Sequence, residues 1–181
     1  LGKIHLNWGK GLSGDFIHQN ALDYNQELDQ IIVNNDSMGE VLIVDHGGTF
    51  VRGDFEASKA LAAGPKGDIL YRWGNPSLYN SGEAPSYNPS GNVASDGDQR
   101  LFHHHDSQWI KDGLPGAGNL LIFQNGSRHP GPHQSQLLEV NPYKGAYPDT
   151  EYLSELDADD SAAQVMWSFK ARYANSFTSH N

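Results

Sequence analysis

The feature that most constrains the fold is an internal repeat, which relates the first half of the chain to the second. Four short segments rich in Val, Ile, Leu and aromatic residues occur in the first half, at residues 18–24, 29–34, 39–45 and 68–73. Four segments of the same kind follow at residues 105–110, 118–125, 135–141 and 164–169. Successive counterparts are 87, 90, 96 and 96 residues apart, with His18 corresponding to His105 in the first pair. A chain that holds two copies of one unit is expected to build one substructure twice.

Each unit is predicted to form four β-strands, because short apolar runs bounded by Gly, Asn and Asp are typical of strands. The pairs Asp112-Gly113 and Asn125-Gly126 favour tight turns between antiparallel strands. Four antiparallel strands form one blade of a β-propeller. We therefore predict an all-β propeller domain over residues 1–181, with blade-like units at about 15–74 and 102–170 and a long loop at 75–101. Helix signals are sparse, and only residues 55–63 favour two helical turns.

Two blades do not close a ring, since propellers typically have about four to eight of them. The second unit ends near Lys170, and Ser179-His180-Asn181 is similar to the start of a third unit. We expect the remaining blades to come from further sequence of a larger propeller or from self-association. A pair of blades standing alone would leave apolar sheet faces exposed.

Charge and composition narrow the class of partner. The chain has 181 residues, with 22 acidic and 12 basic side chains, a net charge of −10 and no Lys/Arg cluster. Nucleic acids and anionic membranes both attract concentrated positive charge, so we predict neither as a partner. The absence of cysteine excludes thiolate catalysis and disulfides. No apolar run reaches the roughly 18 residues that span a bilayer, and residues 1–5 do not resemble a signal peptide.

Histidines recur at related places in the repeat. His18 precedes the first predicted strand of unit one, His105 stands at the same place in unit two, and His180 follows the last strand of unit two. First strands of propeller blades line the central channel, where three imidazoles can exchange protons near neutral pH, act as nucleophiles or bind a metal. The alternative is that each histidine only donates a hydrogen bond to a loop carbonyl.

The run His103-His104-His105-Asp106 contains three candidate side chains in a row. Adjacent residues of a strand point to opposite faces, so at most His103 and His105 share one side. We favour His105, because Trp109 and Ile110 set the register of the strand that follows.

Arg128 follows the Asn125-Gly126 turn at the end of a predicted strand. A guanidinium group offers two parallel donors to a sulfate, phosphate or carboxylate group. An ordinary surface arginine is the alternative. His129 and His133 lie in the same Gly/Pro-rich loop, where we expect them to face solvent.

Several segments in order resemble the arylsulfotransferase (aryl-sulfate sulfotransferase) family. They are DFIHQNALDYN at residues 15–25, LYRWGNP at 70–76, HDSQWI at 105–110 and GNLLIFQNGSR at 118–128. The resemblance extends over about residues 7–181. It implies a six-bladed β-propeller, secreted or periplasmic, that moves a sulfuryl group from a phenolic sulfate to a phenol through a sulfated histidine. No cofactor or metal is implied.

Carried over residue by residue, the resemblance assigns the catalytic set to His18, His105, Arg128 and His180. His18 and His105 match two family histidines, and Arg128 matches the family's sulfuryl-binding arginine. The nucleophilic histidine lies further along the family's chain, which leaves His180 as its candidate here. Because the family's other blades lie outside these residues, we expect the 181-residue chain alone not to catalyse the reaction.

Two other interpretations stay open. A propeller of this kind can be a non-catalytic binding or structural module of an extracellular assembly or fibre, since one fold hosts many roles. A metal-dependent hydrolase that uses the histidines as ligands is a third possibility. Convergence of His18, His105 and Arg128 on one pocket favours the enzyme, whereas a channel filled by side chains favours the module.

Overall fold

The computed structural model describes residues 17–47, 51–62, 67–90, 93–127, 129, 134–145, 147, 151–153 and 164–170. Within these ranges the elements in chain order are β1 (Leu22–Asn25), β2 (Gln30–Asn35), η1 (Asp36–Met38), β3 (Glu40–Asp45), α1 (Phe55–Ala62), β4 (Ile69–Trp73), η2 (Pro76–Tyr79), β5 (Ser86–Tyr87), β6 (Val93–Ser95), β7 (His104–Trp109), β8 (Leu120–Gln124), β9 (Gln136–Val140) and β10 (Val165–Lys170). The two η elements are short 3-10 helices. The prediction of a mostly β-sheet chain is confirmed.

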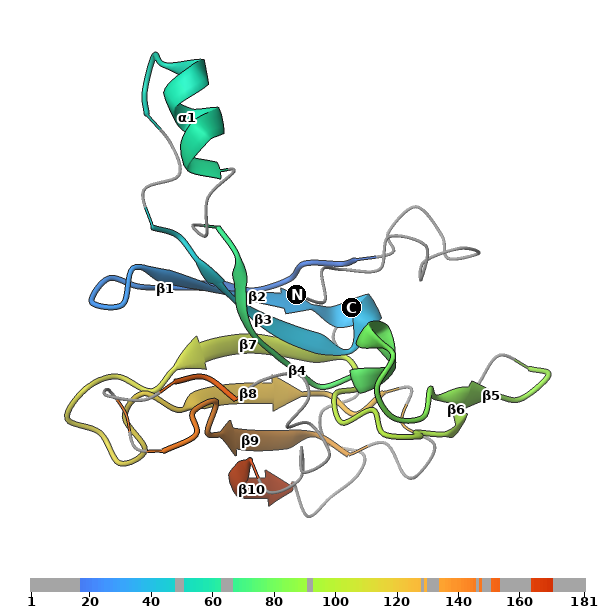
Figure 1. Cartoon of the computed structure of the whole chain (residues 1–181). Helices are drawn as coiled ribbons and strands as arrows, with labels where there is room; N and C mark the ends of the chain where they lie inside the picture. Colours follow the sequence, from blue (N-terminus) through green and yellow to red (C-terminus); the bar gives the residue numbers. More distant parts are fainter. Residues whose placement is uncertain are drawn as a thin grey trace.

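Two four-stranded antiparallel sheets correspond to the two repeat units. Sheet 1 has the strand order β1-β2-β3-β4, and sheet 2 has the order β7-β8-β9-β10. Each of these eight strands overlaps a segment predicted from the repeat. The two sheets are stacked one above the other, with β7 next to β1 and β2 (Figure 1).

The hydrophobic core lies between the two sheets. It is formed by Ile32, Val41, Ile43, Tyr71 and Trp73 of sheet 1, Leu101, and Trp109, Leu120, Ile122, Leu138 and Val140 of sheet 2. These side chains come from alternate positions along their strands, as expected when one face of each sheet is buried. Stacking of the sheets therefore supplies the main apolar burial of the described residues.

The register of the sheets corrects the alignment of the repeat. Asn35 lies opposite Glu40 in sheet 1, and Gln124 lies opposite Gln136 in sheet 2. The third strands of the two units are 96 residues apart, and so are the fourth strands. On this basis Asn35 corresponds to Gln124, so the second strands are 89 residues apart instead of the predicted 90. A shift of one residue matters because it moves every side chain of a strand to the other face.

As a consequence, the two sheets meet through faces that are not equivalent in the repeat. Val41 faces the core in sheet 1, whereas its counterpart Leu137 lies outside the buried cluster. In sheet 2 the core residue is Leu138, whose counterpart in sheet 1 is Leu42. The repeat units thus pack front to back rather than front to front.

Each sheet also has a far face, turned away from the other sheet. On sheet 1 this far face includes Leu22, which is 68% exposed and lies opposite Val33. On sheet 2 it includes Phe123 and Leu137, together with Phe169, which is 53% exposed and pairs with Leu137. The far face of sheet 1 is therefore open at Leu22, and that of sheet 2 is open at Phe169.

The segment between β4 and β7, predicted as a loop without elements, contains η2 and the short β5–β6 hairpin. It also covers the end of sheet 1. Leu78 of η2 is buried, and the ring of Tyr79 lies 4.7 Å from the guanidinium carbon of Arg72. Asn75 donates a hydrogen bond to the carbonyl of Met38 at 2.8 Å. The prediction was wrong because these elements are short and polar, without the apolar period on which it relied.

The predicted helix is present as α1, which projects from the connection between β3 and β4 (Figure 1). Its first residue, Phe55, is 76% exposed. Across the described ranges, the helices are too short and too polar to cross a membrane.

Candidate functional site

The candidate site is built around the start of β7, where an irregularity changes the direction of the side chains. The pairing of β7 with β8 shifts register between His105 and Gln108, and Asp106 has a φ of 50°. Such a bulge re-aims the residues that follow it. As a result His104, Ser107 and Trp109 are all buried. His105 points away from this buried side and stays partly exposed.

His104 is the buried centre of the site, with a completely covered side chain. Its Nε2 donates to the carbonyl oxygen of Glu40 at 3.0 Å, since a carbonyl can only accept. Burial away from water lowers the pKa of His104 to about 3, with further lowering by the neighbouring His105 and His103. His104 is therefore neutral near physiological pH and has its lone pair on Nδ1.

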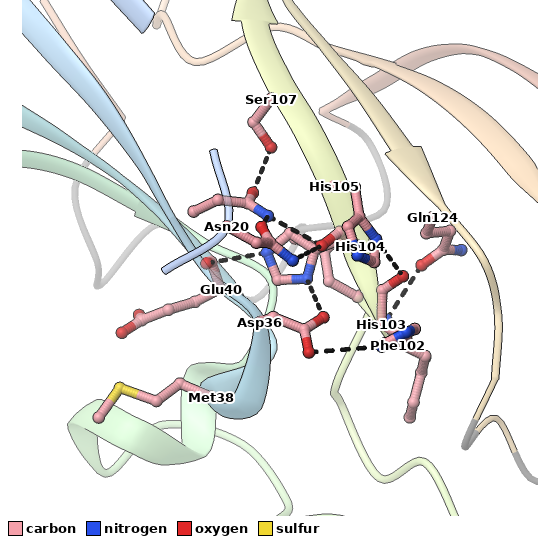
Figure 2. Close-up of polar contacts among 12 residues, drawn as sticks. Asn20, Asp36, Met38, Glu40, Phe102, His103, His104, His105, Ser107 and Gln124 are labelled. Carbon is pink, nitrogen blue, oxygen red and sulfur yellow. Dashed lines mark hydrogen bonds and ion pairs between the residues drawn. The ribbon is translucent and has the colours of Figure 1, made fainter. Parts of the chain in front are cut away.

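Two asparagines, one in β2 and one just before β1, fix the backbone of His104. Asn20 and Asn34 each donate a side-chain hydrogen bond to the His104 carbonyl, at 3.0 and 2.9 Å. Asn34 also donates to Oδ1 of Asn20 at 2.6 Å and accepts from the hydroxyl of Ser107. Figure 2 shows this network around the His104 ring. The bonds connect sheet 1 to β7, so the place of the histidines depends on both sheets.

Asp36, in η1, lies between two of the histidines (Figure 2). Its Oδ2 is 3.4 Å from Nδ1 of His103, and its Oδ1 is 3.9 Å from Nδ1 of His104. The Asp36 side chain is only 2% exposed. Neutral His104 presents a lone pair at Nδ1, so the imidazole that faces Asp36 more favourably is that of His103, through an electrostatic contact without hydrogen-bond geometry. The backbone N–H of Asp36 donates to the carbonyl of His18 at 3.2 Å.

His103, just before β7, and His105, within it, lie side by side. Their rings meet edge to face, with centroids 4.8 Å apart. Nδ1 of His105 is 3.3 Å from the carbonyl oxygen of His103, so Nδ1 carries the hydrogen. The same carbonyl accepts from the backbone N–H of Asn125 at 2.9 Å. The hydrogen bond thus uses Nδ1 of His105 and leaves Nε2 as its other ring nitrogen.

Of the four predicted residues, the structure describes His18 and His105. His18 is exposed, and its backbone carbonyl accepts from the N–H of Asp36, whose side chain approaches His103, the ring that packs against His105. This link uses the backbone of His18 and not its imidazole. His18 does not hold the place in sheet 1 that His105 holds in sheet 2, because it precedes β1 by four residues whereas His105 lies within β7. The predicted equivalence of these two histidines is thus wrong in register.

Arg128 and His180 lie outside the described residues. The residues beside Arg128 are placed, and they pack against the start of β7. The N–H of Gly126 donates to the carbonyl of Phe102 at 3.1 Å, and the ring of His129 meets that of Phe102 with centroids 4.9 Å apart. His129 lines a cavity, whereas the sequence predicted that it only faces solvent.

Two cavities lie at opposite ends of sheet 2. A cavity of about 160 Å³ near the start of β7 is lined by Phe102, Gln124, Gln136, His129, Arg100 and Lys170, among others. A second cavity, of about 240 Å³, lies near the end of β7 and is lined by Asp23, Glu27, Trp109, Lys111, Asp112 and Tyr147, among others. The first lies at the same end of β7 as the histidines, so it is the one next to the candidate site.

Sequence reasoning missed Asp36, Asn20, Asn34 and the buried role of His104. The residues that form hydrogen bonds with His104 lie 64 to 84 positions away from it in the chain, so no local pattern reveals them. One available signal was the polar run Asn34-Asn35-Asp36 directly after an apolar strand. Polar residues that follow a buried strand often lie at a site.

Within the described ranges no three His, Asp or Glu side chains are arranged to hold a metal ion. No protein-family model, curated protein or solved structure matches this chain.

Proposed function

We propose that this chain is part of a β-propeller enzyme of the arylsulfotransferase kind, which moves a sulfuryl group from an aryl sulfate to a phenol. The observation on which the proposal rests is the state of His105. Its Nδ1 is bound to the carbonyl of His103, and its Nε2 is the nitrogen left for proton exchange. A partly exposed imidazole with one committed nitrogen suits a general acid and base. The secreted or periplasmic location belongs to the same proposal.

The propeller part of the proposal is supported by the front-to-back packing of the sheets. Units that use one face toward the preceding unit and the other toward the next can continue in a series, as propeller blades do. Phe169 and Leu22, on the two far faces, mark where further sheets would pack. Those sheets are blades of the same polypeptide or of further copies of it.

The proposed reaction has two displacements at sulfur. In the first, an imidazole nitrogen attacks sulfur, the bond from sulfur to the aryl oxygen breaks, and the phenolate takes a proton from a protonated histidine. In the second, the acceptor phenol gives its proton to that histidine, its oxygen attacks sulfur, and the nitrogen–sulfur bond breaks. His180 is the proposed nucleophile, and His105 gives and takes the proton at Nε2. His18 and Arg128 stabilise the sulfuryl oxygens.

A non-catalytic binding or structural module is the second candidate. The exposed apolar side chains of the far faces favour it, because they suit assembly of sheets whether or not the histidines react. The full burial of His104 favours it too, since that side chain fills space rather than lining an open channel.

The deciding experiment is an acceptor-dependent assay on the complete native polypeptide. The protein is incubated with a chromogenic aryl sulfate, with and without a phenol. We expect release of the chromophore that needs the phenol, and loss of at least about a hundredfold in His105→Ala and Arg128→Ala. His46→Ala is the matched control, because His46 is exposed and lies just after β3, at the end of sheet 1 far from His105. A well-folded protein without turnover would leave the non-catalytic module as the better account.

A further inference from the structure

Asp36 connects the histidines of the site to one another. Its backbone N–H binds the carbonyl of His18 at 3.2 Å, and its carboxylate lies 3.4 Å from Nδ1 of His103. The ring of His103 packs against that of His105. Asp36 therefore contacts the segment of His18 directly and reaches His105 through one intervening ring (Figure 2).

The Asp36 carboxylate needs a donor, because buried carboxylates are destabilising unless they are hydrogen-bonded or paired. The neutral His104 cannot supply one, since Nδ1 of that ring holds a lone pair and Nε2 is committed to Glu40. Nδ1 of His103 is the closer of the two imidazole nitrogens, at 3.4 Å from Oδ2 of Asp36. This approach is electrostatic, without hydrogen-bond geometry, and the negative carboxylate favours the hydrogen of His103 on Nδ1.

The backbone of His103 is held in an uncommon conformation, with a φ of 54°. Residues other than glycine rarely adopt positive φ unless their surroundings hold them there. The side chain of His103 is held by Asp36, and its carbonyl is held by Asn125 and His105. In this conformation the carbonyl of His103 meets Nδ1 of His105 at 3.3 Å, so a contact that holds the His103 side chain also supports the hydrogen bond that orients His105.

We propose that Asp36 is a positioning residue of the histidine site, which acts through His103 to keep the hydrogen of His105 on Nδ1 and to leave Nε2 for the reacting groups. The role of His105 in catalysis rests on the proposed function, whereas the hold of Asp36 on the two imidazoles does not. Asp36 acts through His103 and does not touch the reacting groups.

The test reads the imidazole nitrogens directly. ¹⁵N NMR of the complete histidine-labelled polypeptide, assigned with His103→Gln and His105→Gln, gives the tautomer of each ring. In the native protein we expect the Nδ1–H tautomer for the neutral rings of both His103 and His105. In Asp36→Ala we expect both rings to shift toward the Nε2–H tautomer, and Asp36→Asn, which keeps an acceptor oxygen, to restore most of the native signal.

Asp29→Ala is the matched control, because Asp29 holds Nδ1 of His46 at 2.7 Å in the same kind of pair at the other end of sheet 1. It is expected to change the His46 signal and leave His105 unchanged. Native His105 signals in a folded Asp36→Ala protein would overturn the proposal. The tautomer shift without any turnover by the native protein would instead remove the proposed function and leave the positioning role intact.

Where the native protein is active, kinetics add a second measurement. Asp36→Ala is expected to lower kcat about tenfold and to change KM by no more than about twofold, because a misoriented His105 ring weakens proton transfer more than substrate binding. Asp36→Asn is expected to recover at least half of the native kcat. Equal kcat in the native and Asp36→Ala proteins would contradict the link to catalysis.

Discussion

The two sheets share strand order and pairing, but one pair of equivalent positions is charged in sheet 1 and neutral in sheet 2. In sheet 1 these positions hold Glu40 and Arg72, a buried ion pair with Oε2 and Nη2 2.8 Å apart. In sheet 2 they hold Gln136 and Ser168, 96 residues later in each case. The neutral pair needs no cover, and Gln136 lines the cavity next to the histidines. The backbone repeat thus tolerates either chemistry, and the surroundings of each sheet decide which one is stable.

The residues that cover the Glu40–Arg72 ion pair explain why sheet 1 holds charges at these positions and sheet 2 does not. The guanidinium of Arg72 lies under the ring of Tyr79, and the side chains of Glu40 and Arg72 are 0% and 1% exposed. Charges taken out of water need full pairing, and Arg72 provides it with Nε and Nη2 both donating to the carboxylate. At the corresponding end of sheet 2, Gln124 and Gln136 bind each other through their amides at 3.0 Å.

Breaking the ion pair is expected to have the largest effect. Arg72→Met leaves the Glu40 carboxylate buried without its partner, and the free energy of unfolding is expected to fall by about 3–5 kcal/mol. Urea unfolding followed by tryptophan fluorescence measures it. The double variant Glu40→Gln/Arg72→Met, which gives sheet 1 the neutral character of sheet 2, is expected to lose much less. Equal losses in the two variants would contradict the role assigned to charge.

The pH dependence of stability sharpens the comparison at β7. His104 has a folded pKa of about 3, below its value of about 6.5 in the unfolded chain. As pH falls below about 6.5, the unfolded chain binds a proton that folded His104 does not, so the folded state loses about 1.4 kcal/mol per pH unit down to about pH 3.

His104→Gln keeps a donor for the carbonyl of Glu40 but does not titrate. Between pH 6 and pH 4 the free energy of unfolding of the variant is expected to fall less steeply than that of the native protein. The difference in slope is expected to be about 1.4 kcal/mol per pH unit. Urea unfolding across this pH range measures the difference. Parallel curves for the two proteins would mean that His104 takes up its proton in the folded state.

The two buried amides give a smaller contrast. Asn34→Ala removes two donated bonds and the acceptor for Ser107, and is expected to cost about 2–3 kcal/mol. Gln124→Ala removes the acceptor for the N–H of Phe102 and one bond to Gln136, and is expected to cost about 1–2 kcal/mol. Thermal or urea unfolding of both variants ranks them. The reverse order would show that the cavity end of sheet 2 is the more tightly held.

The smallest effect is expected on the far face of sheet 2. Phe169 is 53% exposed, whereas its counterpart in sheet 1, Trp73, is 2% exposed in the core. In the 181-residue chain Phe169→Ala is expected to change stability by no more than about 0.5 kcal/mol. In a complete polypeptide with a sheet packed there, the same change is expected to cost several times more. A similar small value in both proteins would remove support for a further blade on this face.

The strands of the two sheets could be predicted from the sequence, because apolar runs such as residues 29–34 and 39–45 are long enough to indicate strands without their context. The start of β1 could not. His18 has a φ of 47°, and Asn20 uses its side chain to bind β7, so the strand begins only at Leu22. The spacing of the second strands was wrong by one residue because similarity of apolar residues does not determine the face on which they lie.

The candidate site was predicted only in part. His105 was favoured because Trp109 and Ile110 set the register of its strand, and in the structure its ring packs against that of His103. The bulge at Asp106 and the burial of Asp36 depend on sheet packing, which no local pattern contains. Residues that are polar, buried and held by distant partners are those for which a sequence gives the least warning.

The meander order of the strands has a consequence for how the chain folds. Each sheet pairs strands that are neighbours in sequence, so each forms by closing short loops. The bonds that hold His104 join residues 64, 70 and 84 positions apart, and they exist only after the sheets have docked. Formation of the histidine site is therefore a late event, and hydrogen exchange at the ring Nε2–H of His104, which binds Glu40, reports the docking of the sheets rather than the stability of either one.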